Sequence, residues 1–167
     1  PQFKATAIDP CGFAELVRFS RLHVEQVMFR LPASMSFETA SFAEPLACAV
    51  RAVERSQMLA GDRLLVIGAG SMGLLIAQAV LARGGQVVLA DISQARLDLA
   101  RAVGVSAAVD VSRQRLPAAL AAAPGGGEVD GAILTVVNQE ILADAQQVLA
   151  SGGRLNIFAG PAGGSRL

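Results

Sequence analysis

One short segment constrains the fold more than any other part of this sequence. The apolar run Leu64-Leu65-Val66-Ile67 leads directly into Gly68-Ala69-Gly70-Ser71-Met72-Gly73, and a helical pattern follows. At a strand-to-helix turn each glycine has a mechanical reason. Gly68 permits the tight turn, Gly70 lets a pyrophosphate approach the backbone, and Gly73 lets the helix pack closely on the strand. The helix N-terminus then provides N–H groups and a positive dipole for phosphates.

The rest of the chain from Gly61 onward alternates short β-branched runs with longer Ala/Leu-rich runs. This alternation is typical of successive βαβ units around a parallel sheet. We therefore predict an α/β fold, a doubly wound parallel sheet of the Rossmann type. The predicted strands are Leu64–Ile67, Val87–Ala90, Ala107–Val109, Val129–Val136 and Leu155–Phe158. The predicted helices are Ser71–Arg83, Ser93–Val103, Arg115–Ala123 and Gln139–Ala150.

The ends and faces of these helices carry further expectations. Ser93 and Asn138 are candidate N-caps, and Gly152-Gly153 is expected to close the last helix. The first helix is apolar on nearly all sides, so we expect it to be buried between the sheet and another element. That element could lie inside or outside the chain.

An acidic residue stands where a dinucleotide-binding fold places its ribose ligand. Asp91 ends the second predicted strand, close to the ~20-residue spacing expected after the glycines. A fixed negative charge there pairs with the free hydroxyls of NAD and repels the 2′-phosphate of NADP, so NAD is favoured. Arg96 could stack on adenine, pair with Asp91 or simply be a solvated arginine, and it leaves some room for NADP. The structural alternative for Asp91 itself is a helix-capping acid.

The first 60 residues have a different character. Gly12–Phe19 alternates like an edge strand, and Val27–Leu31 is predicted to be a second extended piece ending at Pro32. Ser36–Phe42 is predicted to be a short helix. Pro45 is expected to open another that runs to about Arg55, because proline suits the first helical turn.

Composition excludes several classes of function. The chain of 167 residues has 14 basic and 14 acidic side chains, which gives no preference for nucleic acid or an anionic membrane. No apolar run reaches the ~18 residues that a membrane span requires. Cys11 and Cys48 have no paired spacing, and no signal peptide is evident, so a cytoplasmic location is expected. The abrupt ends suggest a fragment of a longer protein.

Several segments taken together resemble a known family. Gly12–Val17, Leu31-Pro32, Phe42-Ala43-Glu44-Pro45-Leu46-Ala47-Cys48, Gly61-Asp62 and Val66–Gly73 follow one another as in the zinc-containing medium-chain dehydrogenases. The sorbitol and threonine dehydrogenase branch is the most similar. The segment around Glu44-Pro45 is far more specific than the glycines alone.

The resemblance implies a domain order and an activity. Residues 1–35 would be a remnant of the N-terminal catalytic, GroES-like β domain, residues 36–60 connecting helices, and residues 61–167 an NAD-binding Rossmann domain that is incomplete at its C-terminus. In this family a hydride passes between NAD and the carbinol carbon of an alcohol or polyol, while zinc acts as a Lewis acid on the alcohol oxygen. Members commonly form dimers or tetramers. The fragment alone is expected to be inactive.

The resemblance also implies roles for individual residues. Glu44 matches a glutamate at or near the zinc; its structural alternative is an N-cap of the helix that begins at Pro45. The other family ligands, a cysteine and a histidine, would lie upstream of Pro1. His23, the one histidine, is expected to be a surface or hinge residue. No catalytic side chain is assigned. The predicted cofactor-binding set is Gly68, Gly70, Ser71, Met72, Gly73, Asp91, Ile92, Arg96, Thr135, Val136, Val137, Phe158, Ala159 and Gly160.

Two other classes of function share parts of this pattern. A regulatory module that senses NAD or NADH without catalysis would have the glycine turn and Asp91, but no reason to carry Phe42–Cys48. An S-adenosylmethionine methyltransferase usually lacks the third glycine, so Gly73 argues against it. The sequence does not identify which alcohol, polyol or amino alcohol would be the substrate.

Overall fold

A computed structural model describes residues 12–160 of the chain. The chain divides into two compact units, Pro1–Ser41 and Phe42–Leu167. Within the described residues, no helix is both long enough and apolar enough to cross a membrane.

The first unit does not form the two extended pieces that were expected, and a helix lies between them. Gly12–Phe19 is not an edge strand, since these residues form bends and an isolated bridge at Arg18. Helix α2 (Arg21–Val27) was not predicted; it begins where the Ser20 side chain accepts a hydrogen bond from the His23 backbone N–H. Val27 therefore ends a helix instead of starting an extended piece.

Two further expectations for this unit have different outcomes. His23 is buried, with its ring nitrogen Nδ1 2.8 Å from the Ser20 hydroxyl, so it is not a surface residue. The short helix α3 (Phe37–Ala40) lies within the predicted range, and the Ser36 side chain caps it.

The second unit is built on one parallel sheet. Within residues 12–160 the sheet has five strands in the order β3-β2-β1-β4-β5, and every pairing is parallel. The step from β3, β2 and β1 to β4 and β5 reverses the direction of winding at β1. This confirms the predicted doubly wound Rossmann topology. The strands are β1 (Arg63–Ile67), β2 (Gln86–Asp91), β3 (Ala107–Asp110), β4 (Val129–Leu134) and β5 (Leu149–Ile157).

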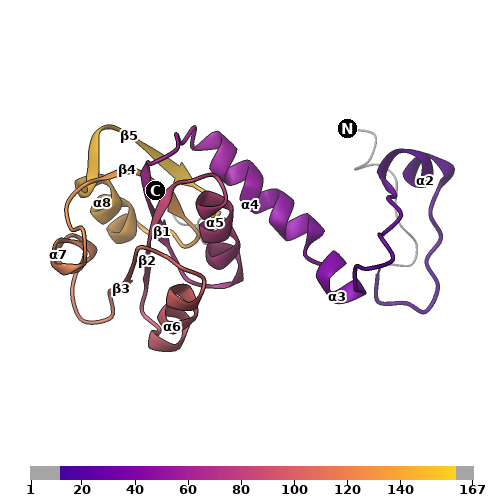
Figure 1. Cartoon of the computed structure of the whole chain (residues 1–167), viewed down its shortest axis with the longest axis horizontal. Helices are drawn as coiled ribbons and strands as arrows, with labels where there is room; N and C mark the ends of the chain where they lie inside the picture. Colours follow the sequence, from indigo (N-terminus) through magenta and orange to yellow (C-terminus); the bar gives the residue numbers. More distant parts are fainter. Residues whose placement is uncertain (1–11, 161–167) are drawn as a thin grey trace. The chain divides into compact units, whose positions relative to one another are not determined.

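Helices cover both faces of this sheet. Figure 1 shows α7 and α8 on one side of the strands and α5 and α6 on the other. The helices of the unit are α4 (Ala43–Arg55), α5 (Ser71–Leu81), α6 (Gln94–Ala102), α7 (Leu116–Ala122) and α8 (Gln139–Gln147).

The central strand shows why β1 has an unbroken apolar sequence. Leu64 and Val66 point into the core beneath α4, α5 and α6, whereas Leu65 and Ile67 point into the core beneath α7 and α8. All four side chains are buried. A strand covered on both faces needs apolar residues at successive positions, as this one has.

Helix α4 provides the second cover of α5 that the sequence required. Ala49 and Val53 of α4 share a core with Ile76 and Ala77 of α5. The cover that the sequence left open therefore lies within the chain. The side-chain amide of Asn156 on β5 also donates to the Ala52 carbonyl at 2.9 Å, which ties α4 to the sheet.

The last βα unit differs from its prediction in register. Strand β4 ends at Leu134, two residues earlier than expected, and α8 ends at Gln147. Strand β5 begins at Leu149, and its register against β4 shifts between Val129 and Gly131. Gly152, with φ +80°, lies in this irregular segment and does not close a helix.

The helix starts also separate correct from incorrect expectations. Asn138 caps α8 through its side chain, which accepts from Ile141 N–H at 2.7 Å. Ser93 occupies the N-cap position of α6 without a side-chain capping bond. Helix α4 begins two residues before Pro45, with Phe42 as its N-cap, so Glu44 lies in the first turn and is not the cap.

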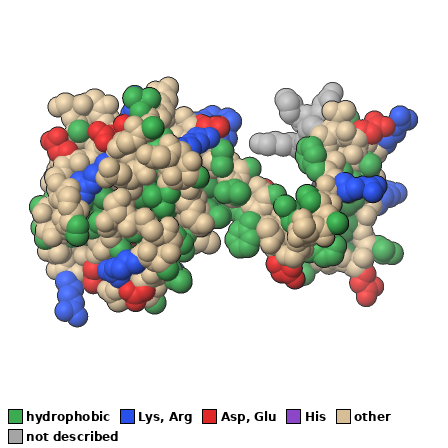
Figure 2. Space-filling model, in the orientation of Figure 1, with side chains coloured by type: hydrophobic (Ala, Val, Ile, Leu, Met, Phe, Trp, Pro, Cys, Tyr) green, Lys and Arg blue, Asp and Glu red, His purple; other side chains and the backbone are tan. Residues whose placement is uncertain are grey.

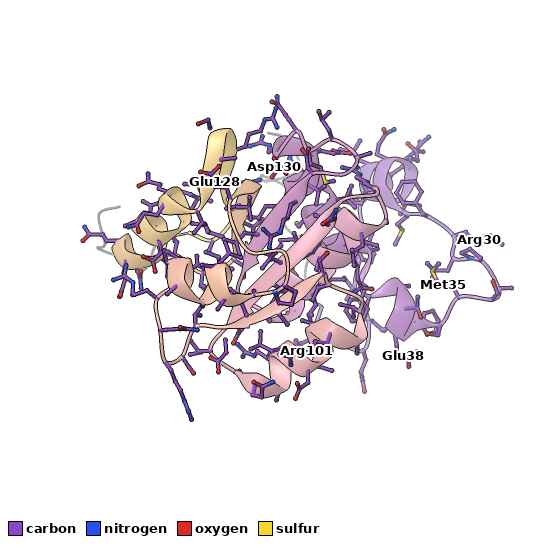
Figure 3. The ribbon with its side chains drawn as sticks, turned by 60° about the vertical axis from the view of Figure 1, so that its left-hand side comes forward. Arg30, Met35, Glu38, Arg101, Glu128 and Asp130 are labelled. Atoms are coloured by element: carbon purple, nitrogen blue, oxygen red, sulfur yellow. The ribbon has the colours of Figure 1, made fainter. Side chains whose placement is uncertain are left out.

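The amino edge of the sheet is held by polar groups around Arg63. Its backbone N–H donates to the Asp130 carboxylate at 2.8 Å, and its guanidinium donates to the Glu128 carbonyl at 3.3 Å. Glu128 and Asp130 are labelled in Figure 3. These contacts fix the start of β1 against β4.

Candidate functional site

The glycine turn at the carboxyl end of β1 has no room for side chains at two of its positions. Gly68 has φ +100°, and a Cβ there would lie 2.3 Å from the Thr135 hydroxyl oxygen. A Cβ on Gly73 would lie 1.8 Å from the Gly68 carbonyl oxygen. The turn therefore depends on glycine at both positions, for backbone conformation at the first and for close packing at the second.

Gly70 differs from its two neighbours in the motif. Its φ of −70° is accessible to any residue, and a Cβ there would meet nothing within 4 Å. Gly70 is the N-cap of the 11-residue helix α5. Within the described part of the chain, no side chain caps the first N–H groups of this helix. The first N–H groups of α5 are therefore left to bind an anion that approaches over Gly70.

A cavity of about 580 Å³ opens at this carboxyl edge. A second hollow, lined by Asp62, Asp130 and Arg154, measures only about 110 Å³. In doubly wound sheets ligands bind outside the carboxyl ends of the strands, where the winding direction changes. The large cavity has this location, since residues that follow β1, β2, β3 and β4 all line it.

Asp91 is fixed at the end of β2 by backbone groups. One carboxylate oxygen accepts Ala69 N–H at 2.6 Å, and the other accepts Ser93 N–H at 2.8 Å. The side chain is only 5% exposed, and the Arg96 guanidinium lies 3.7 Å away. Asp91 thus holds both the glycine turn and the start of α6. Because each carboxylate oxygen has two lone pairs, acceptor capacity remains toward the cavity.

The structure brings most of the predicted cofactor-binding residues together. The cavity is lined by Gly68, Gly70, Ser71, Met72, Gly73, Asp91, Ile92, Arg96, Thr135 and Val136. Val137, Phe158, Ala159 and Gly160 are not among its lining residues. The backbone N–H groups of Phe158 and Ala159 both donate to the Leu134 carbonyl at 3.0 Å, which keeps the end of β5 beside the end of β4.

Thr135 joins the two middle strands beneath the cavity. Its hydroxyl donates to the Ile67 carbonyl at 2.8 Å, and its backbone N–H donates to the same oxygen at 2.9 Å. This side chain therefore occupies the space that a Cβ on Gly68 would need. Val136, half exposed, follows it at the cavity wall.

A further wall of the cavity was missed by sequence reasoning. It comes from the loop after β3, from the start of α7 and from α8, and it consists of Val111, Gln114, Arg115, Leu116, Glu140, Ile141 and Asp144. Val111 and Arg115 follow the end of a predicted parallel strand, as Asp91 does, and that position was an available signal. The α8 residues belong to no motif. Only tertiary packing brings them to the site.

An ion-pair cluster forms the polar part of this wall. The Arg115 guanidinium donates through Nε to Asp144 at 2.9 Å and makes a second bond to the same carboxylate through Nη2. Its Nη1 lies 2.9 Å from a Glu140 carboxylate oxygen. The hydrogen bonds from Arg115 lower the pKa of Asp144, and a weaker bond from Leu116 N–H lowers it further. Burial has the opposite effect and raises this pKa.

The described residues do not assemble a zinc site. Within residues 12–160 no group of three or more His, Cys, Asp or Glu side chains could hold a metal ion. Glu44 is exposed, and its carboxylate accepts a hydrogen bond from the Cys48 thiol at 3.2 Å. This bond raises the pKa of the Cys48 thiol. Glu44 as a metal ligand stays a prediction.

The face of the Phe42–Leu167 unit in Figure 2 shows no large patch of one charge. On the face of the Phe42–Leu167 unit seen in Figure 2, acidic and basic side chains are interspersed. A concave cavity at a switch point, lined by apolar side chains and by charged side chains of both signs, fits a small ligand better than a large polyanion.

The fold and the glycine turn define this unit as a Rossmann domain. Residues 71–167 match the family model described as zinc-binding dehydrogenase, which covers more than half of the chain. The chain belongs to this family, the zinc-type medium-chain dehydrogenases.

Named relatives agree with this membership. The chain is 34% identical over 149 residues to the (R,R)-butanediol dehydrogenase of Bacillus subtilis (strain 168), covering 89% of this chain and 42% of that protein. It is 26% identical over 161 residues to the sorbitol dehydrogenase of the same organism, covering 96% of this chain and 44% of that protein. The chain thus spans less than half the length of these relatives.

A solved structure gives the same result for the fold. A zinc-binding dehydrogenase of Sinorhizobium meliloti 1021, in a crystal structure bound to NADP, superposes with a TM-score of 0.76 at 29% identity, covering 83% of this chain and 42% of that chain. The sequence-based resemblance to this family is confirmed.

Proposed function

We propose that the cavity at the carboxyl edge binds NAD and that the chain is the cofactor-binding portion of an alcohol or polyol dehydrogenase. The observation that carries the proposal is the open space over Gly70 in front of the uncapped N-terminus of α5. Beside it lies Asp91, fixed with acceptor capacity to spare. An anionic pyrophosphate followed by a ribose with free hydroxyls matches this sequence of groups.

Each predicted residue then has a proposed role. The N–H groups of Ser71, Met72 and Gly73 hold the pyrophosphate over the turn. Asp91 accepts hydrogen bonds from the ribose hydroxyls. The nicotinamide end is assigned to the edge formed by β4 and β5, with Thr135, Val136, Val137, Phe158, Ala159 and Gly160.

NAD is proposed over NADP on electrostatic grounds. A buried carboxylate at the ribose site repels a 2′-phosphate unless a cation offsets it. Arg96 is the candidate for that cation, but its guanidinium lies 3.7 Å from Asp91 and is more than half exposed, so solvent weakens its effect. The ribose wall, with Ile92 beside Asp91, therefore favours the uncharged hydroxyls of NAD.

The proposed reaction is hydride transfer between NAD and a CH–OH group. Bound nicotinamide supplies the hydride acceptor, and this chain binds and orients it. We propose that residues 1–35 are a remnant of the catalytic domain, that residues 61–167 are the NAD-binding domain and that residues 36–60 connect the two. Glu44 would approach a zinc ion only with ligands from outside the described residues. We expect no turnover by the 167-residue chain alone and a dimer or tetramer for the whole enzyme.

The variant Asp91→Asn tests the cofactor assignment. The change keeps the side-chain size but removes the charge, so a charge-assisted hydrogen bond worth about 1.5–3 kcal/mol is weakened. Calorimetric titration of the chain should show NAD binding weakened by about tenfold or more, and a smaller ratio of NAD to NADP affinity.

Asp110→Asn is the matched control for this experiment. Asp110 pairs with Asp91 across β2 and β3 and also accepts a backbone N–H, from Ser112 at 2.8 Å. It does not line the cavity, so its variant should bind both nucleotides as the unmodified chain does. An unchanged NAD to NADP ratio in Asp91→Asn would contradict the proposed role of Asp91. Absence of NAD binding by the unmodified chain would contradict the proposed function.

A further inference from the structure

The guanidinium of Arg115 is held at the cavity wall by two carboxylates. Its Nε and Nη2 bond to Asp144, and its Nη1 bonds to Glu140, so all three nitrogen atoms have a carboxylate partner. The Asp144 side chain is only 8% exposed, whereas that of Arg115 is 56% exposed. The anchor is buried and the arginine still reaches the surface of the cavity.

This arrangement decides which part of Arg115 can meet a ligand. The guanidinium is planar, and its N–H donors lie in its plane. Carboxylates bond to one donor on each nitrogen, three of the five N–H groups, and hold the plane of the group in place, so that its faces are available to a ligand. Guanidinium faces stack on aromatic rings, with a gain from the charge and the ring quadrupole.

The net charge of the Arg115, Glu140 and Asp144 cluster argues against phosphate binding, the other common use of an arginine in a nucleotide site. Arg115 carries one positive charge, and Glu140 and Asp144 each carry one negative charge, which leaves the cluster net negative. A phosphate would be repelled, whereas a neutral aromatic ring would not. The apolar side chains of Val111, Leu116 and Ile141 in the same wall also favour such a ring.

The sheet order places this wall at one end of the proposed cofactor. The pyrophosphate is assigned to the turn after β1 and the ribose to Asp91 after β2. Arg115 follows β3, the next strand outward in the order β3-β2-β1. The group beyond the ribose in this direction is the adenine base.

We infer that Arg115 binds the adenine ring by stacking and that Asp144 and Glu140 are positioning residues for its guanidinium. This inference rests on the proposed NAD-binding function and extends it to residues outside the glycine motif. Because the side chain is fixed before the nucleotide arrives, little rotamer freedom is lost on binding.

The test uses Arg115→Lys in the full chain. Lysine keeps the positive charge beside Asp144 but has no planar face. Binding of ADP-ribose, measured by calorimetry, should weaken about fivefold, the equivalent of a stacking contact of about 1 kcal/mol. Ribose 5-phosphate, which has no base, should bind equally to both proteins in an NMR titration. A purely structural role for Arg115 would change both ligands together.

Arg113→Lys is the matched control, because Arg113 is an exposed arginine in the same loop and does not line the cavity. It should bind ADP-ribose as the unmodified chain does. If Arg115→Lys melts at a lower temperature, the double variant Arg115→Met/Asp144→Asn replaces it, since it removes the guanidinium without leaving a buried carboxylate unpaired. The same fivefold loss is expected.

The outcomes separate the two proposals. Unchanged ADP-ribose affinity in a folded Arg115 variant overturns the stacking role while leaving the NAD-binding function in place. Equal losses for ADP-ribose and ribose 5-phosphate also overturn it. Failure of the unmodified chain to bind ADP-ribose overturns the proposed function itself.

Discussion

Two walls of one cavity are built in opposite ways. The wall at β1 is made of backbone: Gly68 and Gly73 remove side chains so that turn, strand and helix touch. The wall at α7 and α8 is made of side chains, with Arg115 bonded to Asp144 from 29 residues away in the sequence. The first wall is encoded within six consecutive residues. The second exists only after two helices have packed together.

This difference predicts how each wall responds to mutation. Where the backbone is in close contact, at Gly68 and Gly73, even one added methyl group forces atoms apart. In the second wall one side chain can be substituted at a time, and its loss changes the charge of the cavity more than the shape of the backbone. Substitutions at the two walls should therefore differ in size and in the property that they affect.

The largest effect is expected for Gly73→Ala. Alanine would gain about 1 kcal/mol in helix propensity, but its Cβ would lie 1.8 Å from the Gly68 carbonyl oxygen. Overpacking of this kind costs about 1–3 kcal/mol or more, so the free energy of unfolding in urea should fall. Gly70→Ala is the control in the same turn, because its Cβ would meet open space. Equal stability of the two variants would contradict the packing role of Gly73.

A second, smaller effect concerns binding without stability. Gly70→Val places a branched side chain where the pyrophosphate is proposed to approach, at a backbone conformation that valine accepts. NAD affinity should fall about tenfold to a hundredfold, while the melting temperature changes little. Gln78→Val, at an exposed position of α5 outside the cavity, should bind NAD normally. Normal NAD binding by Gly70→Val would argue against the proposed phosphate position.

The smallest effect concerns the second wall and depends on pH. The pKa of Asp144 is lowered in the folded chain by Arg115, so the unfolded chain binds the proton more tightly. The resulting stability is present above the ordinary aspartate pKa of about 3.9. It is lost as the pH falls below that value through the folded pKa.

Asp144→Asn removes this proton linkage. Between about pH 5 and pH 3 the unfolding free energy of the variant should fall less steeply than that of the unmodified chain, by at most about 1.4 kcal/mol per pH unit. Urea unfolding at a series of pH values measures the slope. Identical slopes would mean that the Arg115–Asp144 bond does not persist in solution.

The parts predicted correctly from sequence were those governed by local chemistry. The glycine turn, the apolar strand β1 and the Asn138 cap each depend on residues close in the chain. In the first unit the short helix α3 was predicted, but the alternation at residues 12–19 did not form a strand. Strand alternation was inferred for residues 12–19, whereas Ser20 instead caps the helix that contains His23.

By itself, the sequence determined the strand, turn and helix around Gly68–Gly73, the parallel sheet and the position of Asp91 at its carboxyl edge. These features follow from the periodicity of apolar residues and from glycines at the positions where the strand-to-helix turn needs them. The tertiary structure decided that α4 covers α5 and that Glu140 and Asp144 fix Arg115 at the cavity. Such contacts join residues far apart in the chain, and no local pattern encodes them, because helix packing alone sets which side chains meet.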